Sequence, residues 1–354
     1  MKLCFLTPLA RRGPWRTPEY GVGTWPLALG GDLFPYAEPD LAPLKACDVL
    51  FLHVAMGHYG DALRVLDRFP KKPVVLMLTC DAMFIDPQGF FPCWKTPLKR
   101  LLDRACLALS ETEETGFFQA MTTTPVVHLP LPLPLAAMRE ARDEGRESRG
   151  EGRGARVEGE ETACGASSPP IRNPKSAIRN SSLVLLGSGF RPKKNGVATA
   201  MAFRRLRASE PSARALLFAE EPDAERTAYA LWGVEGVDVR PATCDQPDYW
   251  RQAARCGLAL HLDYRRTVGR FSGECAALGV PCISTASVTM QRACFPELIV
   301  GRWDVEGAAA LAARVLRDPV FRGRVVARAA EAAVAFDLDP MAARFRALLR
   351  RYVV

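Results

Sequence analysis

The sequence predicts an α/β protein made of two tandem, doubly wound parallel sheets that face each other across a cleft. Three observations carry this prediction. Short apolar runs alternate with helical patterns up to residue 135, the same alternation restarts at residue 182, and a long polar stretch separates the two parts. A chain of 354 residues is also too long for one ordinary core and suits two domains.

Residues 1–135 are the predicted first domain. The runs Asp48–Val54 and Pro73–Thr79 are apolar throughout, which is typical of parallel strands that are buried on both faces. Further strands are expected at 2–7, 106–109 and 125–131, with helices at 59–69 and 98–104. Ser110 and Glu113 have the spacing of a capping box, which predicts that a helix begins there.

Residues 136–181 are the predicted linker. The stretch from Arg139 to Glu161 mixes arginine, glutamate and glycine and has almost no large apolar side chain. Such a composition cannot bury enough apolar surface to offset the entropy of ordering the chain. We therefore expect a disordered connection between the two domains.

Residues 182–338 are the predicted second domain. Its strands are expected at 182–186, 213–218, 237–240, 258–262 and 281–284. The last segment, 339–354, has Met341, Phe345 and Leu349 on one helical face, with arginines opposite. A terminal helix of this kind is expected to pack back on the first domain; the alternative is a helix that lies on a membrane surface.

Composition narrows the class of protein. No apolar run approaches the length of a transmembrane helix, and the first residues do not resemble a signal peptide, so a cytoplasmic protein is expected. The eleven cysteines form no Cys-x-x-Cys pair, and the four histidines are far apart, so neither disulfides nor zinc are expected.

The net charge of +8 lies almost entirely in the second domain, which suits an anionic ligand or an anionic membrane face. Few aromatic residues accompany those arginines, so no nucleic acid is expected as a partner.

The first candidate site is a glycine-rich, basic turn between a strand and a helix, LGSGFRPKKNG at 186–196. Glycine lets the backbone approach a ligand, and the helix that follows offers free N–H groups to an anion. The turn is neither a dinucleotide fingerprint nor a P-loop, and a solvated surface turn is the alternative. The candidate contacts to a diphosphate are Gly187, Ser188, Gly189, Arg191, Lys193 and Lys194.

Two further segments carry candidate residues. The loop and short helix at 267–281 (TVGRFSGECAALGVP) contain Arg270 and place Glu274 at the expected helix N-terminus, where a carboxylate can hold the vicinal hydroxyls of a ribose. An ordinary helix cap is the alternative. In the first domain, Asp81 follows an apolar strand, and ligands of open α/β sheets bind beyond the carboxyl ends of the strands.

Together these segments resemble the glycosyltransferases of the GT-B fold, which have two Rossmann-like domains. The closer resemblance is to the large retaining family of bacterial glycan and lipopolysaccharide biosynthesis, glycosyl transferases group 1. The turn at 187–194 is similar to that family's diphosphate-binding segment, and Glu274 matches the second glutamate of its two-glutamate motif. The segments Ala105–Ser110 and Val305–Phe345 are similar to further parts of the family pattern. Arg266 stands where the family has its first glutamate, which contacts the donor sugar.

The resemblance implies a glycosyltransferase that moves a sugar from a nucleotide-diphosphate sugar to a glycan, lipid-linked or other acceptor. Arg191 and Lys194 would stabilise the charge on the diphosphate leaving group, Asp81 would face the cleft, and Arg266, Arg270 and Glu274 would contact the donor. No metal or other cofactor is expected, and retention of configuration is implied. The alternative is a degenerate, non-catalytic GT-B paralogue that binds a sugar nucleotide or acts as a scaffold.

Overall fold

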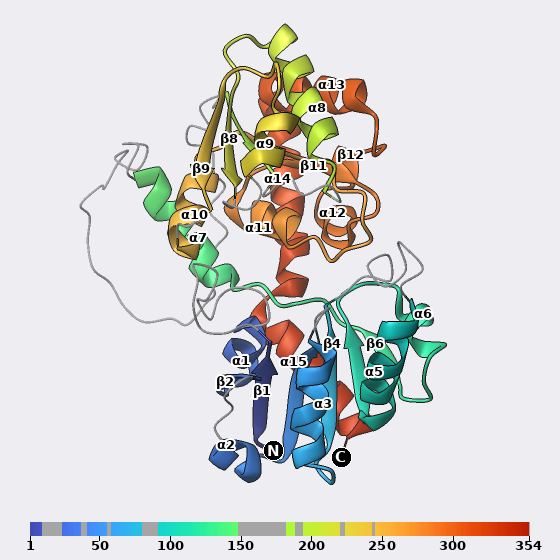
Figure 1. Ribbon diagram of the computed structural model, residues 1–354. Coiled ribbons are helices and arrows are strands. Elements are labelled where there is room, and N and C mark those ends of the chain that lie inside the picture. Colours follow the sequence, from blue (N-terminus) through green and yellow to red (C-terminus); the bar gives the residue numbers. More distant parts are fainter. Residues whose placement is uncertain are drawn as a thin grey trace, which may run out of the picture.

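The computed structural model describes residues 1–8, 23–36, 41–54, 58–79, 91–147, 182–187, 194–219, 224–242 and 245–353. These residues form two α/β domains, drawn one above the other in Figure 1. Each domain has a six-stranded sheet in which every pair of neighbouring strands is parallel. The predicted fold class, two doubly wound sheets in tandem, is confirmed.

The first sheet has the strand order β2-β1-β3-β4-β5-β6. Its strands are β1 (Leu3–Thr7), β2 (Leu33–Pro35), β3 (Val49–Val54), β4 (Val74–Leu78), β5 (Leu107–Ser110) and β6 (Val126–His128). Its helices are α1 (Thr24–Leu29), α2 (Leu41–Ala46), α3 (Tyr59–Arg68), α5 (Phe91–Arg104) and α6 (Thr115–Gln119).

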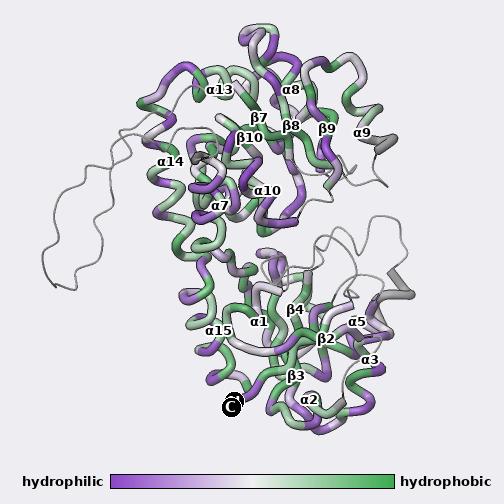
Figure 2. Tube along the Cα trace, turned by 90° about the vertical axis from the view of Figure 1, so that its left-hand side faces the viewer, coloured by the Kyte–Doolittle hydropathy of each residue, from purple (hydrophilic) through white to green (hydrophobic). Residues whose placement is uncertain are grey.

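Helices cover both faces of this sheet. Successive residues of a strand point to opposite faces, so β1 contributes to two clusters. Cys4 and Leu6 join the core beneath α3 and α5. Leu3 and Phe5 join the core on the other face, which includes Trp25 of α1. Because both faces are covered, the central strands are hydrophobic along most of their length (Figure 2).

The second sheet has the strand order β12-β11-β10-β7-β8-β9. Its strands are β7 (Leu183–Leu186), β8 (Arg214–Ala219), β9 (Val237–Pro241), β10 (Leu258–His261), β11 (Cys282–Thr285) and β12 (Ile299–Val300). Its helices are α7 (Leu135–Glu147), α8 (Gly196–Ser209), α9 (Ala224–Ala230), α10 (Gln246–Ala253), α11 (Arg270–Leu278), α12 (Thr289–Cys294), α13 (Val305–Arg317) and α14 (Pro319–Ala333), with short 3-10 helices η4 (Pro296–Leu298) and η5 (Val334–Phe336). The last helix, α15 (Leu338–Tyr352), packs on the first domain.

Helix α7 corrects the predicted start of the disordered linker, because the chain is helical from Leu135 to Glu147. Leu135, Met138 and Ala141 lie on one face and are buried in the core of the second domain. A Cβ on Gly145 would come within 2.7 Å of the carbonyl oxygen of Arg251 in α10. The sequence analysis overlooked this face because alanine and glycine form part of it. Residues 148–181 of the predicted linker lie outside the described residues.

The chain passes between the domains twice, and the two passages pair with each other. The amide of Leu133 donates to the carbonyl of Phe336 at 2.7 Å. Asp337 caps α15 and also accepts from the amide of Leu135 at 3.3 Å. Helix α15 then runs along the first domain (Figures 1 and 2), where its apolar face, predicted from the spacing, is buried in the cluster around Trp25. None of the described helices has the length and hydrophobicity needed to cross a membrane.

We predict that Phe345→Ala destabilises the first domain by about 3–5 kcal/mol, since it leaves a cavity beneath the sheet. Phe345 is fully buried, and its ring centroid lies 5.2 Å from that of Trp25 and 5.6 Å from that of Phe51. Chemical denaturation of the parent and the variant, followed by tryptophan fluorescence, measures this change in the free energy of unfolding. The control is Arg346→Ala, an exposed position on the same helix, and equal losses in both variants would contradict the prediction.

Candidate functional site

The second sheet reverses its winding direction between β7 and β10. After β7 the chain builds β8 and β9 on one side, and β10 then returns to the other side of β7. In open α/β sheets the crevice at the carboxyl ends of such a strand pair is where ligands bind. Gly187 directly follows β7, and His261 ends β10. The predicted glycine-rich turn therefore starts at this crevice.

Gly187 packs directly against His261. Its amide donates to the carbonyl of Leu260 at 2.9 Å, and a Cβ on Gly187 would lie 2.4 Å from the imidazole ring of His261. From the sequence we interpreted this glycine as a residue that lets the backbone approach a ligand. The structure adds a second reason, because no larger residue fits beside this buried ring.

Lys194 and Asn195 connect the turn to helix α8. Burial lowers the pKa of His261 to about 4; Asp263 opposes this effect, and the nearby charges of Lys194 and Arg265 add to it. Lys194 therefore places its positive charge at the switch point of the sheet. Asn195 has a left-handed backbone, and its side-chain amide donates to the carbonyls of Leu262, at 3.1 Å, and Arg302, at 2.6 Å, which anchors the start of α8.

Arg266 is exposed, and its acidic neighbour Asp263 is already engaged. Asp263 is buried and accepts from Arg265 Nε at 3.0 Å and Nη2 at 2.8 Å. Burial by itself would raise the pKa of Asp263, but these hydrogen bonds hold it below its usual range. Asp263 thus supports the loop after β10 and does not replace the acid that the resemblance expects at position 266.

Glu274 does not stand at a helix N-terminus, which corrects the predicted placement. Helix α11 begins at Arg270 after Gly269, whose φ of 76° suits glycine, so Glu274 lies one turn further along. Its side chain is only 6% exposed, and its Oε1 accepts from Arg270 Nε at 2.8 Å and from Gln246 Nε2 at 3.5 Å. The predicted donor residues Arg270 and Glu274 are thus brought together as an ion pair.

The first sheet also changes direction, between β1 and β3, and has its own polar cluster there. His53 is buried between two threonines: its Nδ1 lies 3.1 Å from Oγ1 of Thr7, and its Nε2 lies 2.7 Å from Oγ1 of Thr79. Burial lowers the pKa of His53 to about 3, so the ring is neutral at physiological pH. Asp81, the predicted cleft residue two positions beyond Thr79, lies outside the described residues.

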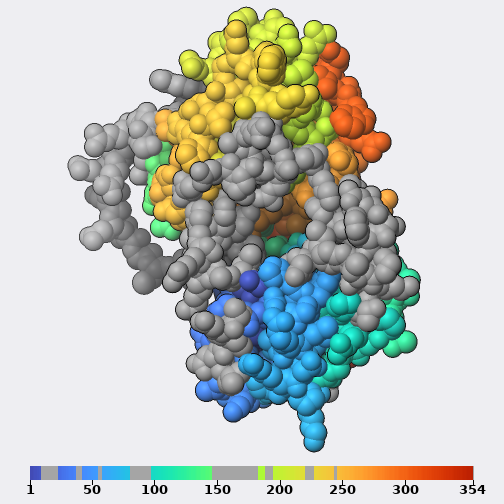
Figure 3. All heavy atoms as spheres, viewed as in Figure 1, coloured from blue at the N-terminus to red at the C-terminus, as the bar shows by residue number. Residues whose placement is uncertain are grey.

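The loop after β5 contacts the second domain through Glu113. The predicted capping box of Ser110 and Glu113 is wrong. Ser110 ends β5, α6 begins only at Thr115, and Glu113 instead pairs with Arg292 of the second domain and accepts from Thr289 at 3.3 Å. The carboxyl edge of the first sheet therefore meets the second domain next to α11 and α12. Figure 3 shows the surface hollowed between the two domains.

Glu111 of the same loop is also buried. Its Oε1 is buried and accepts no hydrogen bond from any described residue. Burial raises the pKa of Glu111 to about 8, and the positive charge of Arg270 opposes this effect. Burial also lowers the pKa of His128, which ends β6, and the charge of Glu113 opposes this effect.

Several predicted residues lie outside the described residues: Ser188, Gly189, Arg191 and Lys193. Among the described residues no cluster of histidine, cysteine, aspartate and glutamate has the make-up of a metal site. The sequence contains one Asp-x-Asp triplet, at 337–339, and its first aspartate serves as the cap of α15.

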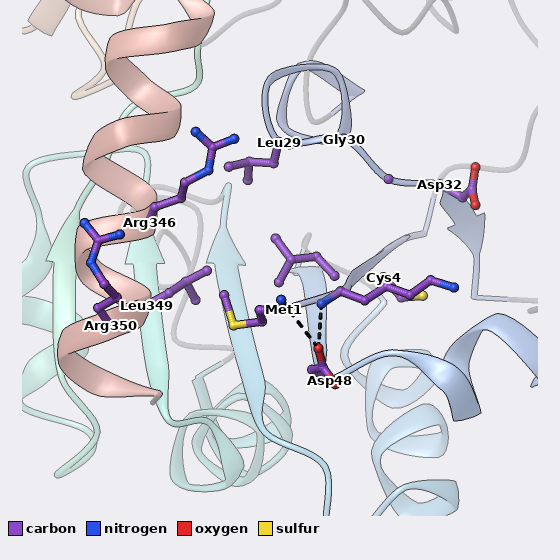
Figure 4. Close-up of a pocket in the computed structure, with 12 residues that line it drawn as sticks. Met1, Cys4, Leu29, Gly30, Asp32, Asp48, Arg346, Leu349 and Arg350 are labelled. Atoms are coloured by element: carbon purple, nitrogen blue, oxygen red, sulfur yellow. Dashed lines mark hydrogen bonds and ion pairs between the residues drawn. The ribbon is translucent and has the colours of Figure 1, made fainter.

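A separate pocket of about 810 Å³ opens at the amino ends of the first sheet's strands (Figure 4). Leu3, Asp32 and Asp48 line it from the sheet side, and Arg346 and Arg350 of α15 line it from the other. It lies at the end of the sheet away from the second domain, so it is not part of the edge at which the two domains meet.

No family model matches the sequence, and no curated protein matches it. Solved structures do match. A UDP-forming α,α-trehalose-phosphate synthase from Burkholderia xenovorans has a TM-score of 0.65 at 13% identity, covering 88% of this chain and 77% of its own. A trehalose-6-phosphate synthase structure from E. coli with bound UDP-2-fluoro glucose has a TM-score of 0.63 at 13% identity, covering 88% and 75%. The apo structure of OtsA has a TM-score of 0.67 at 12% identity, with both chains covered completely.

These similarities show the fold: the chain has the two-domain GT-B architecture. At 12–13% identity they show no more than that. The particular resemblance to glycosyl transferases group 1 stays a prediction, since the structures named above are trehalose-phosphate synthases.

The sequence analysis missed Glu111, His53 and His261 as members of the two facing edges. His53 lies one residue before the end of β3, His261 ends β10, and Glu111 follows β5, and this position near the carboxyl end of a strand was the available signal. A histidine or a glutamate within such a run has no motif of its own, so only the arrangement of the strands brings these residues together.

We predict that Gly187→Ala destabilises the second domain by about 1–3 kcal/mol, because the added methyl group must displace the buried His261 ring. Thermal unfolding measures the effect. Gly323→Ala is the matched control in the same domain: nothing lies within 4 Å of the new methyl group, so a gain of roughly 0.5–1 kcal/mol is expected in helix α14. A neutral Gly187→Ala would show that the His261 contact is not a constraint.

We predict that the stability advantage of Glu111→Gln over the parent grows with pH. The pKa of Glu111 is raised from 4.5 to about 8 in the folded protein, so its protonated form stabilises the fold at low pH, and that contribution is lost as the pH rises through about 8. Melting temperatures measured from about pH 5 to about pH 9 test this. Parallel curves for the two proteins would contradict it.

Proposed function

We propose that this protein is a nucleotide-sugar-dependent glycosyltransferase. The observation that carries the proposal is the position of Gly187 and Lys194 at the carboxyl end of β7, beside His261 at the end of β10, with the buried carboxylate of Glu274 in α11, the helix that follows β10. These residues suit a nucleoside diphosphate. The glycine lets the backbone approach the phosphates, the lysine neutralises their charge, and the carboxylate accepts hydrogen bonds from the ribose hydroxyls.

The donor's diphosphate would lie on the turn at 187–194, with the ribose at Glu274. Lys194, together with Arg191, would stabilise the negative charge that grows on the diphosphate as the glycosidic bond to it breaks. The acceptor would enter from the first domain, near Thr79 and Asp81. Closure of the domains would exclude water, so that transfer competes well with hydrolysis.

The named neighbours suggest which donor to try first. One is a UDP-forming trehalose-phosphate synthase, and a further structure of a trehalose-6-phosphate synthase is described in terms of glycosyl transfer with retention. We therefore propose a UDP-sugar as donor, a sugar phosphate, glycan or lipid-linked acceptor, and retention of configuration. The proposal includes a cytoplasmic location and no metal requirement, because cationic side chains take the place of a metal at the diphosphate.

The second candidate is a non-catalytic paralogue that binds a sugar nucleotide. Arg266, which is exposed at the position of the expected acid, favours it, because Asp263 is committed to Arg265 and cannot contact a donor sugar in its place. Binding of a nucleotide sugar without turnover over a panel of acceptors would support this candidate against the enzyme.

We predict that UDP or UDP-glucose raises the melting temperature, whereas adenosine without phosphates does not, because the diphosphate supplies the charge that Lys194 attracts. A thermal-shift series with UDP, GDP, ADP, CMP and dTDP names the donor class. The absence of a shift with all of them would contradict the proposed function.

We predict that Glu274→Gln weakens UDP binding roughly tenfold to a hundredfold, because it removes a charge-assisted hydrogen bond to the ribose. Calorimetric titration measures the dissociation constant. Glu297→Gln is the control, since Glu297 is an acid of the same domain that pairs with Arg328 of α14. Unchanged affinity in Glu274→Gln would remove the assigned role.

A further inference from the structure

The pocket at the amino ends of the first sheet is formed by three segments that are far apart in the chain. These are the start of β1, the loop between α1 and β2, and α15, which follows the second domain. The volume of about 810 Å³ lies within the range of about 300–1,000 Å³ that small-molecule sites occupy. The pocket is complete only when α15 packs against the first sheet.

Buried contacts hold the walls of this pocket in place. On the loop side, a Cβ on Gly31 would lie 2.8 Å from the ring of Phe5, and the amide of Phe5 donates to the carbonyl of Asp32 at 3.3 Å. On the helix side, Leu349 is fully buried in the core of the first domain. The pocket is therefore largely preformed, which lowers the entropic cost of binding a ligand.

Two unpaired guanidinium groups line the helix side. Arg346 and Arg350 are exposed and one helical turn apart, and neither forms a hydrogen bond or an ion pair with any described residue. Figure 4 shows Arg346 reaching from α15 toward Leu29. Side chains four residues apart on a helix are neighbours, so the two positive charges repel each other. An anion that contacts both groups removes this repulsion, and a phosphate matches the planar fork of a guanidinium.

Carboxylates line the opposite side. Asp48 is engaged, because its Oδ2 accepts from the backbone amide of Lys2 at 2.6 Å. The side chain of Asp32 is exposed and accepts no hydrogen bond within the described part of the chain. The lining carries three basic side chains, Lys2, Arg346 and Arg350, against these two acidic ones. The charge favours an anionic ligand, and the carboxylate of Asp32 favours one that also has hydroxyl groups to donate.

Phosphorylated sugars combine these features. Their phosphate carries the negative charge that the arginines attract, and their hydroxyls are donors for a carboxylate. The carbon face of the sugar ring can cover the half-buried side chain of Leu29, which also lines the pocket. A phosphate ion lacks the hydroxyls and an unphosphorylated sugar lacks the charge, so neither uses both walls.

We propose that this pocket binds a phosphorylated sugar, with its phosphate on Arg346 and Arg350 and its hydroxyls on Asp32. The site is separate from the donor and acceptor sites of the proposed function, which lie at the opposite, carboxyl ends of the strands. A ligand in this pocket connects α15 to the first sheet, so its binding stabilises the packed position of the helix.

Calorimetric titration with glucose 6-phosphate tests the site. The parent is expected to bind this probe at least about tenfold more tightly than it binds glucose or inorganic phosphate. The double variant Arg346→Gln/Arg350→Gln is expected to lose at least about tenfold in affinity for glucose 6-phosphate. Asp32→Ala should reduce the preference for glucose 6-phosphate over inorganic phosphate, because it removes the partner of the hydroxyls.

The matched control is Arg344→Gln/Arg351→Gln, which removes the same charge from the same helix. Arg344 donates to Sδ of Met341 at 3.5 Å, the guanidinium of Arg351 lies 5.0 Å from the ring centroid of Tyr352, and neither arginine lines the pocket. This control should bind glucose 6-phosphate as the parent does. A melting temperature for each variant checks its folding, and Asp32→Ala tests the opposite wall even where the arginine variants fold poorly.

Three results would overturn the proposal. One is the absence of glucose 6-phosphate binding by the parent. Another is equal binding by the parent and by Arg346→Gln/Arg350→Gln, which is the result expected if the sugar phosphate binds only between the domains. The third is binding to phosphatidylglycerol vesicles that is weakened equally by both double variants, without binding of glucose 6-phosphate, since α15 would then face a lipid surface. UDP binding is measured separately, so this site and the proposed function can fail independently.

Discussion

The burial of helix α15 against the first sheet is the interaction on which the rest of the structure depends. This helix follows the second domain in the chain, yet Phe345 and its apolar neighbours complete the core of the first. The two passages between the domains run side by side, joined at Leu133 and Phe336, and Asp337 caps α15 while it also bonds to the start of α7. Two adjacent passages therefore connect the domains, and they leave the carboxyl edges of both sheets facing each other.

Each edge is built around a buried, neutral histidine at the point where its sheet changes direction. His53 bonds to two threonines in the first sheet, and His261 packs against Gly187 in the second. Burial lowers the pKa of both rings, so neither adds charge to the boundary. The charge there comes from side chains that reach across or into it, above all Lys194 and Arg270.

The sequence analysis predicted the local segments well and their ends less well. The spacing of Ser110 and Glu113 matched a capping box, but the strand continues through Ser110, and Glu113 is used in a contact to Arg292 that no local pattern reveals. The helix that holds Glu274 begins one turn earlier than expected, because Gly269 can adopt the left-handed conformation from which it starts. Helix α7 was taken for linker because its buried face relies on small side chains, which lack a strong hydrophobic signal.

The sequence by itself determined the two parallel sheets, their order along the chain and the amphipathic last helix, since these follow from the periodicity of apolar residues within a few turns or strands. Only the tertiary structure decided which residues share the boundary between the domains. Glu111 and Arg270 are separated by more than 150 positions, and Glu111 acquires its raised pKa from burial at a surface that exists only once both domains have formed. Burial and long-range charge depend on the whole fold, and no local pattern encodes them.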